Sequence, residues 1–172
     1  YPGFPASGVG INEDEAIMVA FFALLHDQDL DTPISLYARD PAGNYATTPL
    51  EHRAFPKTFA RSQIEINDGF LRRVVPAIAA TTPDLALSTA PDDLVASFLR
   101  INGELRRRND QTIAKQTAIT SGKMLWNDAF QALGNASVES RFADNRTYFY
   151  RGKEIDRQVH LGFDLAVTRR IP

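Results

Sequence analysis

The chain contains no cysteine. This absence excludes disulfide bonds, thiolate nucleophiles and cysteine-based zinc sites, and it leaves histidine and carboxylate side chains as candidate ligands for a transition metal. Histidine is scarce too, because the 172 residues include only His26, His52 and His160. A metal site that uses an imidazole must therefore draw on one of these three residues.

Long apolar runs and an excess of charge of one sign are also missing. No stretch approaches the roughly 20 apolar residues of a membrane-spanning helix, and 19 basic against 21 acidic residues leave a formal net charge of −2. The sequence therefore predicts a soluble chain with no nucleic-acid partner. Its start, Tyr1 to Pro5, has neither a Met nor a signal-peptide pattern, so we expect it to be part of a longer protein.

The first third of the sequence has the period of β structure. Residues 16–25 form an apolar run rich in Val and Phe, and residues 34–40 alternate apolar with polar or small side chains. We expect two strands joined by the acidic loop at 27–33, and then a turn at 40–44, where Pro, Gly and Asn favour tight backbone. The string Ala-Arg-Asp-Pro-Ala-Gly-Asn around this turn resembles the late hairpin of bacterial immunoglobulin-like modules. That resemblance implies an incomplete immunoglobulin-like portion over residues 1–60.

The middle third changes to a helical period, which predicts a helical segment over residues 61–120. Behind a cap at Asn67 or Asp68, apolar side chains recur at helical spacing, at Phe70, Leu71, Val74, Val75 and Ile78. Pro76 is expected to kink or end this helix. A second helix is predicted from Pro91 to about Arg108, and an amphipathic stretch at 111–118 extends the helical region. The basic triplet Arg106, Arg107 and Arg108 then lies at a helix end, where cations suit the dipole; the alternative is a binding patch.

The last third, residues 121–172, predicts a second β unit. Two strand-like segments flank Arg151-Gly152-Lys153, which is typical of a β-hairpin with a three-residue Gly-containing loop. Tyr148 and Tyr150 lie two residues apart before this loop, so they share one face of a strand. That face can line a groove for a ligand, or the two rings can take part in ordinary cross-strand packing.

His160 and Asp164 lie on the polar face of an alternating segment, residues 159–167. In a straight strand, residues four apart are separated by roughly 13 Å, too far for both side chains to reach one metal ion. Gly162, the residue that most easily takes a positive φ, is the expected pivot that lets them converge. By itself the pair also fits a solvent-exposed strand face with an ordinary ion pair or hydrogen bond.

The string His160-Leu161-Gly162-Phe163-Asp164-Leu165-Ala166 resembles the first metal-binding motif of the lysostaphin-type (LytM-like) zinc metallopeptidases, which cut peptidoglycan. In this family the motif follows a Ser-x-x-Phe-x-x-x-Arg-like segment and precedes a proline. Here these elements are the segment from Ser140 to Arg146 and the pair Ile171-Pro172. Family members often have Phe-Gly where this chain has Phe142-Ala143. The resemblance covers about the last 50 residues.

The resemblance implies that residues 121–172 begin an all-β peptidase domain and that His160 and Asp164 are ligands of Zn2+. It further implies cleavage of the peptide cross-bridges of peptidoglycan, a periplasmic or extracellular location, and a membrane tether as an option in the full-length protein. Tyr148 and Tyr150 would bind substrate. The family completes its site with a downstream His-x-His motif, which supplies the third ligand and the general base. This sequence ends before such a motif, so we expect no catalytic residue within it.

The sequence therefore predicts an α+β protein with an immunoglobulin-like β portion, a helical middle and the start of a peptidase domain. Two other functions stay open. One is a non-catalytic envelope protein that binds murein or activates another cell-wall hydrolase. The other is an adhesion or carbohydrate-binding β-sandwich in which the His-x-x-x-Asp pattern is accidental. His26 and His52 lack the context of ligands, and we expect surface positions for both.

Overall fold

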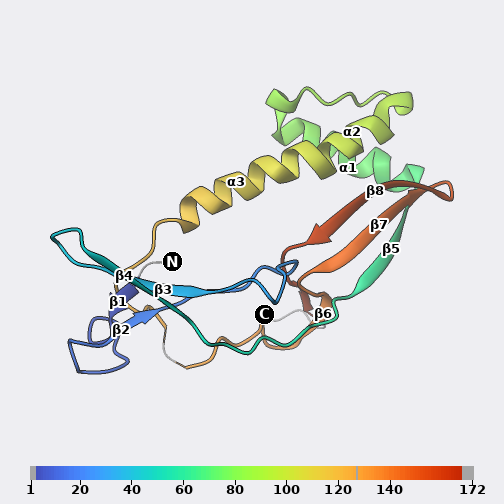
Figure 1. Cartoon of the computed structure of the whole chain (residues 1–172). Helices are drawn as coiled ribbons and strands as arrows, with labels where there is room; N and C mark the ends of the chain where they lie inside the picture. The colour runs from blue at the N-terminus through green and yellow to red at the C-terminus, as the bar shows by residue number, and fades with distance from the viewer. Residues whose placement is uncertain (1–2, 127, 168–172) are drawn as a thin grey trace. The chain divides into compact units, whose positions relative to one another are not determined.

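The computed structural model describes residues 3–126 and 128–167, shown in Figure 1. Tyr1 and Pro2 of the chain start, and Ile171 and Pro172 of the peptidase-like segment, lie outside the described residues. Helices and small sheets both occur, so the predicted α+β class is confirmed. The chain divides into two compact units: the first contains Ala20–Thr58, and the second contains Gly3–Val19 and the chain from Phe59 onward.

The first unit contains an antiparallel hairpin of β3 (Ser35–Arg39) and β4 (Tyr45–Pro49). Its turn is held by Asp40, whose backbone N–H donates to the Asn44 carbonyl at 2.9 Å and whose Oδ1 accepts from the Asn44 N–H at 2.9 Å. Gly43 has a φ of 92° in this turn, a backbone conformation that residues with a side chain rarely adopt. The strand and turn predicted over residues 34–44 are therefore confirmed.

The predicted pairing of residues 16–25 with 34–40 is wrong. Within that run only β2 (Met18–Ala20) is a strand, and it pairs with β1 (Gly3–Pro5), while β3 pairs with β4. The physical reason is that a continuous apolar run carries no period-2 pattern to fix its face or register. The short loop at 40–44 instead lets β3 pair with the strand that follows it directly.

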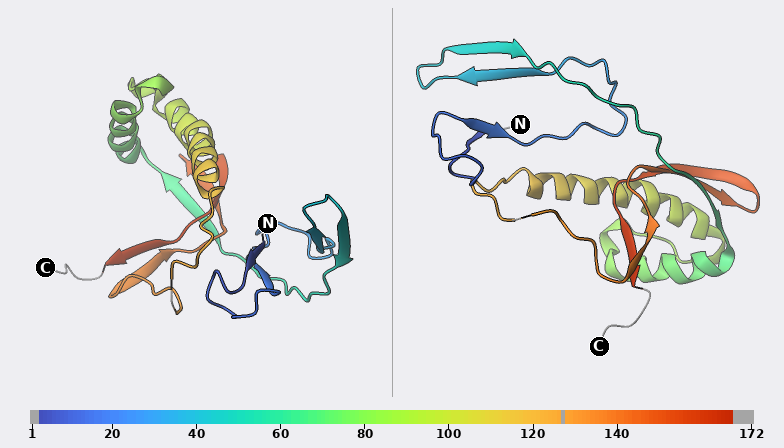
Figure 2. Two further views of the ribbon diagram at one scale, coloured as in Figure 1. Left: turned by 90° about the vertical axis from the view of Figure 1, so that its left-hand side faces the viewer. Right: turned by 90° about the horizontal axis from the view of Figure 1, so that it is seen from below.

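The second unit is built on a three-stranded sheet in the order β5-β7-β8, seen in Figures 1 and 2. Its strands are β5 (Arg61–Ile66), β7 (Asp144–Tyr150) and β8 (Lys153–His160). β5 runs parallel to β7, because the helices between them carry the chain back to the same end of the sheet, and β8 is antiparallel to β7. The segment predicted as helical over 61–120 thus begins with a strand.

The first predicted helix is confirmed as α1 (Asp68–Thr81). Its N-cap is Asn67, whose Oδ1 accepts a 2.8 Å hydrogen bond from the Phe70 N–H. Pro76 is expected from the sequence to kink or end this helix; the helix continues to Thr81, so an end at Pro76 is wrong. A helix end depends on the tertiary packing around the proline as well as on its missing N–H, and the neighbouring Val75 is fully buried.

The second predicted helix is also confirmed, as a nearly continuous run of helical elements. After η1 (Pro83–Leu85) come η2 (Pro91–Asp93), α2 (Leu94–Arg100), the π-helical η3 (Ile101–Leu105) and α3 (Arg106–Thr117). Because the helical run continues past the basic triplet to Thr117, Arg106 to Arg108 lie within the run instead of at its end. The helix-dipole explanation is therefore wrong, and Arg108 instead forms an ion pair with Asp84 of η1.

The core of the second unit lies between the helices and one face of the sheet. It contains Ile66, Leu71, Val75, Leu94, Phe98 and Tyr148, each at most 6% exposed. Phe98 contacts Phe70 and Tyr148 edge to face, with ring centroids 6.1 and 5.9 Å apart. Burying one such large apolar side chain stabilises a fold by about 1.5 to 3 kcal/mol. This packing fixes the position of β7 and, through its ladder, of β8.

The hairpin predicted at Arg151-Gly152-Lys153 is confirmed, with a loop of two residues instead of three. Tyr150 and Lys153 pair across it, and both Arg151 (φ 51°) and Gly152 (φ 73°) are left-handed, as in a type I′ turn. A separate antiparallel pair joins β6 (Ala136–Ser140) to β9 (Asp164–Val167). Among the described residues, no helix is long and apolar enough to cross a membrane.

Candidate metal centre

His160 is the last residue of β8 and lies opposite Asp144, the first residue of β7. Its carbonyl accepts a 2.7 Å hydrogen bond from the Ala143 N–H, which extends the ladder by one residue beyond β7. The imidazole is 12% exposed. The ring is therefore held by backbone pairing on a sheet that the hydrophobic core anchors.

Asp164 begins β9, and the chain between it and His160 is not a strand. This break brings the side chains together: His160 Nε2 lies 3.5 Å from Asp164 Oδ1, instead of the roughly 13 Å of a straight strand. Gly162 lies within the break, yet its φ is not positive, so the predicted left-handed pivot is wrong. A Cβ at Gly162 would lie 3.7 Å from both Cε1 and Nε2 of His160, which is ordinary van der Waals contact, so Gly162 lies beside the ring but is not required there for space.

The two side chains fit the donor set and spacing of a zinc site. Two ligands at about 2.0 to 2.2 Å from a tetrahedral ion lie about 3.3 to 3.5 Å from each other, and the observed separation is 3.5 Å. His160 Nε2 is also buried and has no hydrogen-bond partner among the described residues. A buried imidazole nitrogen without a partner is costly, and coordination by a metal would satisfy it.

In the part of the chain that the structure describes, no group of three His, Asp or Glu side chains could hold an ion. His52, at an exposed position, approaches the Leu50 carbonyl with Nδ1 at 3.0 Å, and it belongs to the first unit, as does His26. Among the described residues, the structure thus brings two candidate ligands together, whereas a catalytic zinc site uses three from protein.

An arginine behind the pair connects Asp164 to the sheet. Nη2 of Arg146, on β7, lies 3.3 Å from Asp164 Oδ2 and donates to Ser140 Oγ at 2.5 Å. Nε of the same guanidinium lies 3.3 Å from Asp144 Oδ2. Ser140 and Arg146 are the first and last residues of the segment that precedes the motif, so the structure gives that segment a direct contact with Asp164.

Asp144 is a buried carboxylate, 5% exposed, whose charge is compensated from two sides. Ser62 of β5 donates its hydroxyl toward Oδ1 and Oδ2 at 2.9 and 2.8 Å, and Arg146 supplies the opposite charge. Burial alone would lower the pKa of Arg146, but its bonds with Tyr148, Asp144 and Asp164 outweigh that effect and raise it. The guanidinium therefore stays cationic. Sequence reasoning missed Asp144 and Ser62, because no local spacing relates β5 to β7.

Ala143 stands where the lysostaphin-type peptidases that this segment resembles often have glycine. It is fully buried and takes a φ of 60°, a left-handed conformation in which glycine is favoured. Its N–H pairs with the His160 carbonyl, so the turn lies directly beside the candidate ligand. The chain thus keeps the backbone conformation that glycine favours although an alanine occupies the position.

The two tyrosines singled out in the sequence have different surroundings. Tyr148 is 6% exposed and packs against Phe98, so it is part of the core. Of the two alternatives for this residue, a groove wall and ordinary packing, its burial fits packing. Tyr150 donates a 2.6 Å hydrogen bond to Asp68 Oδ1 and lines a hollow of about 340 Å³ beside α1 and α2. The bond lowers the pKa of Asp68 and raises that of Tyr150.

The Tyr150 bond to Asp68 predicts a pH-dependent contribution to stability. Because the pKa of Asp68 is lowered in the folded protein, the bond contributes fully to stability above about pH 4, the pKa of an Asp in an unfolded chain. This contribution is lost as the pH falls through the lower pKa of Asp68 in the folded protein. The raised pKa of Tyr150 makes it present below about pH 10 and lost as pH rises further. Tyr150→Phe should therefore reduce the difference in urea midpoint between pH 7 and pH 3. An unchanged pH profile in the variant would contradict this assignment.

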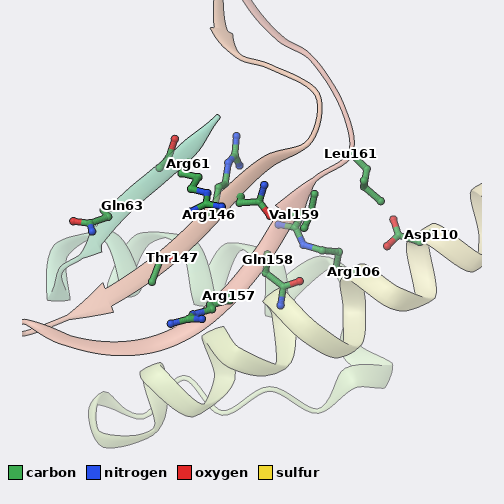
Figure 3. Close-up of a pocket in the computed structure, with 12 residues that line it drawn as sticks. Arg61, Gln63, Arg106, Asp110, Arg146, Thr147, Arg157, Gln158, Val159 and Leu161 are labelled. Atoms are coloured by element: carbon green, nitrogen blue, oxygen red, sulfur yellow. The ribbon is translucent and has the colours of Figure 1, made fainter. Parts of the chain in front are cut away.

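A larger hollow of about 890 Å³ is lined by residues of β5, β7, β8 and α3, several of which Figure 3 labels. It includes Val159 and Leu161, the two neighbours of His160, as well as Arg146. Its lining is basic, with four arginines and one acidic residue: Arg61, Arg106, Arg146, Arg157 and Asp110. An anionic group is therefore favoured in this hollow over a cation.

Comparisons of the chain with protein-family models, curated proteins and solved structures found no match.

Proposed function

We propose that the chain carries two zinc ligands, His160 and Asp164, of a metalloendopeptidase that cleaves peptide cross-bridges of bacterial peptidoglycan. The observation that carries this proposal is the buried, unpartnered His160 Nε2 at 3.5 Å from Asp164 Oδ1, inside a motif that resembles the lysostaphin-type peptidases. A surface ion pair would leave the imidazole in contact with water. Here the imidazole is only 12% exposed, and its Nε2 lies beside the Asp164 carboxylate.

The chain's own residues hold and orient the site in this proposal. His160 contributes the Nε2 lone pair, Asp164 contributes Oδ1, and the sheet keeps the imidazole fixed through its backbone bond with Ala143. When bound, zinc supplies a Lewis acid that polarises a scissile carbonyl and makes a bound water more acidic. The third ligand and the general base come from a segment outside this sequence, as the family pattern implies.

Substrate chemistry is consistent with the basic hollow lined by Arg146, the residue that contacts Asp164. Peptides of peptidoglycan carry free carboxylates, and the arginine-rich lining offers bidentate donors for such groups. Tyr150 is retained as a substrate contact at the second hollow, and Tyr148 supports it from the core. The hairpin of β3 and β4 belongs, in this proposal, to an immunoglobulin-like portion of an envelope protein that acts in the periplasm or outside the cell.

A second function is favoured by one observation, the lack of a three-ligand group among residues 3–126 and 128–167. If the intact protein also lacks a third ligand, the fold would serve a non-catalytic envelope protein that binds murein or activates another cell-wall hydrolase. The two functions differ in whether the purified protein itself releases peptide fragments.

Digestion of purified peptidoglycan by the intact protein tests the proposal. We expect new free amino groups to appear with time, since each cleaved peptide bond releases one. A chelator should stop their release, and added Zn2+ should restore it. Tight binding to peptidoglycan without any release of amino groups, with or without zinc, would support the non-catalytic function instead.

A further inference from the structure

We infer that Arg146 is a positioning residue for the metal site. It holds the Asp164 side chain so that Oδ1 of the carboxylate faces the ion. This inference rests on the proposed zinc site, and it adds a residue outside the ligand set. Arg146 lies on β7, 18 residues before Asp164, and its side chain is only 16% exposed. Ligating carboxylates in metal sites are commonly held by such outer hydrogen bonds.

The contacts of Asp164 divide between its two oxygens. Oδ2 faces Nη2 of Arg146 at 3.3 Å, while Oδ1 faces Nε2 of His160 at 3.5 Å. With Oδ2 held by the guanidinium, the carboxylate can present Oδ1 to a metal as a single donor. Asp164 is 55% exposed and begins a short strand, so without this bond its side chain would be free to rotate into solvent.

The charges of the network allow a cation beside a metal ion. A lone guanidinium near Zn2+ would repel the ion, but Asp144 lies 3.3 Å from Arg146 Nε and compensates its charge. The pair of Asp144 and Arg146 is neutral in sum, which leaves the negative charge of Asp164 for the ion. Asp144 is in turn held by the Ser62 hydroxyl, so the support extends to β5.

The guanidinium is itself held in one geometry. Three of its neighbours, Ser140, Asp144 and Asp164, come from three different segments, and the Ser140 contact is 2.5 Å long. A planar fork with donors in fixed directions can serve all three at once, whereas the single ammonium of lysine cannot. The geometry therefore depends on arginine and not only on a positive charge.

The test is the affinity of the intact protein for Zn2+, measured by calorimetry with Arg146→Met and Arg146→Lys. We expect Arg146→Met to weaken zinc binding by about 10- to 100-fold, the usual loss for an outer-shell partner. Arg146→Lys should lose less. Arg100→Met removes a solvent-exposed ion pair between Arg100 of α2 and Glu104 of η3, and it serves as the matched control with unchanged affinity. Thermal unfolding without zinc separates an effect on the metal site from an effect on the fold.

Each outcome decides the inference. Weaker zinc binding by a folded Arg146→Met, with partial retention in Arg146→Lys, supports it. Zinc affinity that is unchanged or higher in either folded variant overturns the inference. The same holds if a variant lowers only the stability of the zinc-free protein and leaves its zinc affinity unchanged. If Arg146→Met does not fold, Arg146→Lys alone decides by the same criterion. If the wild-type protein binds no zinc, the proposed function fails together with the inference, and this result is distinguishable because it appears without any substitution.

Discussion

His160→Ala in the intact protein is expected to abolish both bound zinc and peptidoglycan cleavage. The substitution removes the imidazole whose Nε2 is buried and faces Asp164 at 3.5 Å. Alanine has no lone pair to offer, and the remaining carboxylate cannot replace a nitrogen donor held by the sheet. Asp164→Ala should have the same two effects, because it removes the other donor. Zinc content by elemental analysis and amine release from peptidoglycan measure both.

A matched control for this prediction is His52→Ala. His52 is exposed and belongs to the first unit, so its removal should change neither zinc content nor cleavage. Circular dichroism must show that each variant is folded, since a histidine at the end of β8 also contributes to packing. Survival of either zinc or activity in a folded His160→Ala or Asp164→Ala protein would remove that residue from the site.

The chain of 172 residues alone is expected to bind zinc far more weakly than the intact protein, and to leave peptidoglycan uncleaved. His160 and Asp164 provide two donors, and no third candidate lies near them in the part of the chain described. Zinc prefers four ligands, so water would fill the remaining positions and contribute no chelate stabilisation. We expect the affinity of the chain to be lower by at least about 100-fold, since it lacks a whole ligand and not only an outer contact.

Calorimetric titration of zinc into the chain and into the intact protein measures this difference. The result is meaningful only if the chain is folded, which far-UV circular dichroism can establish from its helices. Equal affinity of the two proteins would mean that the site is complete within this sequence, and the third ligand would then have to be sought among its own residues.

Features set by neighbouring residues could be predicted from the sequence. The cap at Asn67, the turn at Asp40 and the hairpin at Gly152 depend on side chains within a few positions, and the structure contains all three. Their physical basis is local, because hydrogen bonds to adjacent backbone and the φ preference of glycine do not require the rest of the fold.

Features set by distant contacts could not be predicted. The partner of β2, the continuation of α1 past Pro76 and the burial of Tyr148 all depend on which segments meet in three dimensions. Tyr148 shows this clearly, since its strand face was predicted correctly but α2 covers that face with Phe98. The spacing of apolar residues in the sequence indicates which side chains share a strand face. Whether that face is exposed to solvent depends on the helix that packs against it, here α2.

The candidate site was predictable in part for the same reason. The alternation around His160 and Asp164 shows that they share a face, and their convergence was expected before the structure showed the 3.5 Å separation. The cause differs from the expectation, because the chain breaks between the two strands β8 and β9 without a positive φ at Gly162. Ser62 carried no signal, since it lies 82 residues from Asp144.

Anomalous diffraction at the zinc absorption edge, from crystals of the intact protein grown with zinc, tests the central claim most directly. We predict a single strong peak at about 2.0 to 2.2 Å from both His160 Nε2 and Asp164 Oδ1. A peak at another position, or no peak at this pair in a protein that has both side chains ordered, would contradict the assignment of His160 and Asp164 as a zinc site.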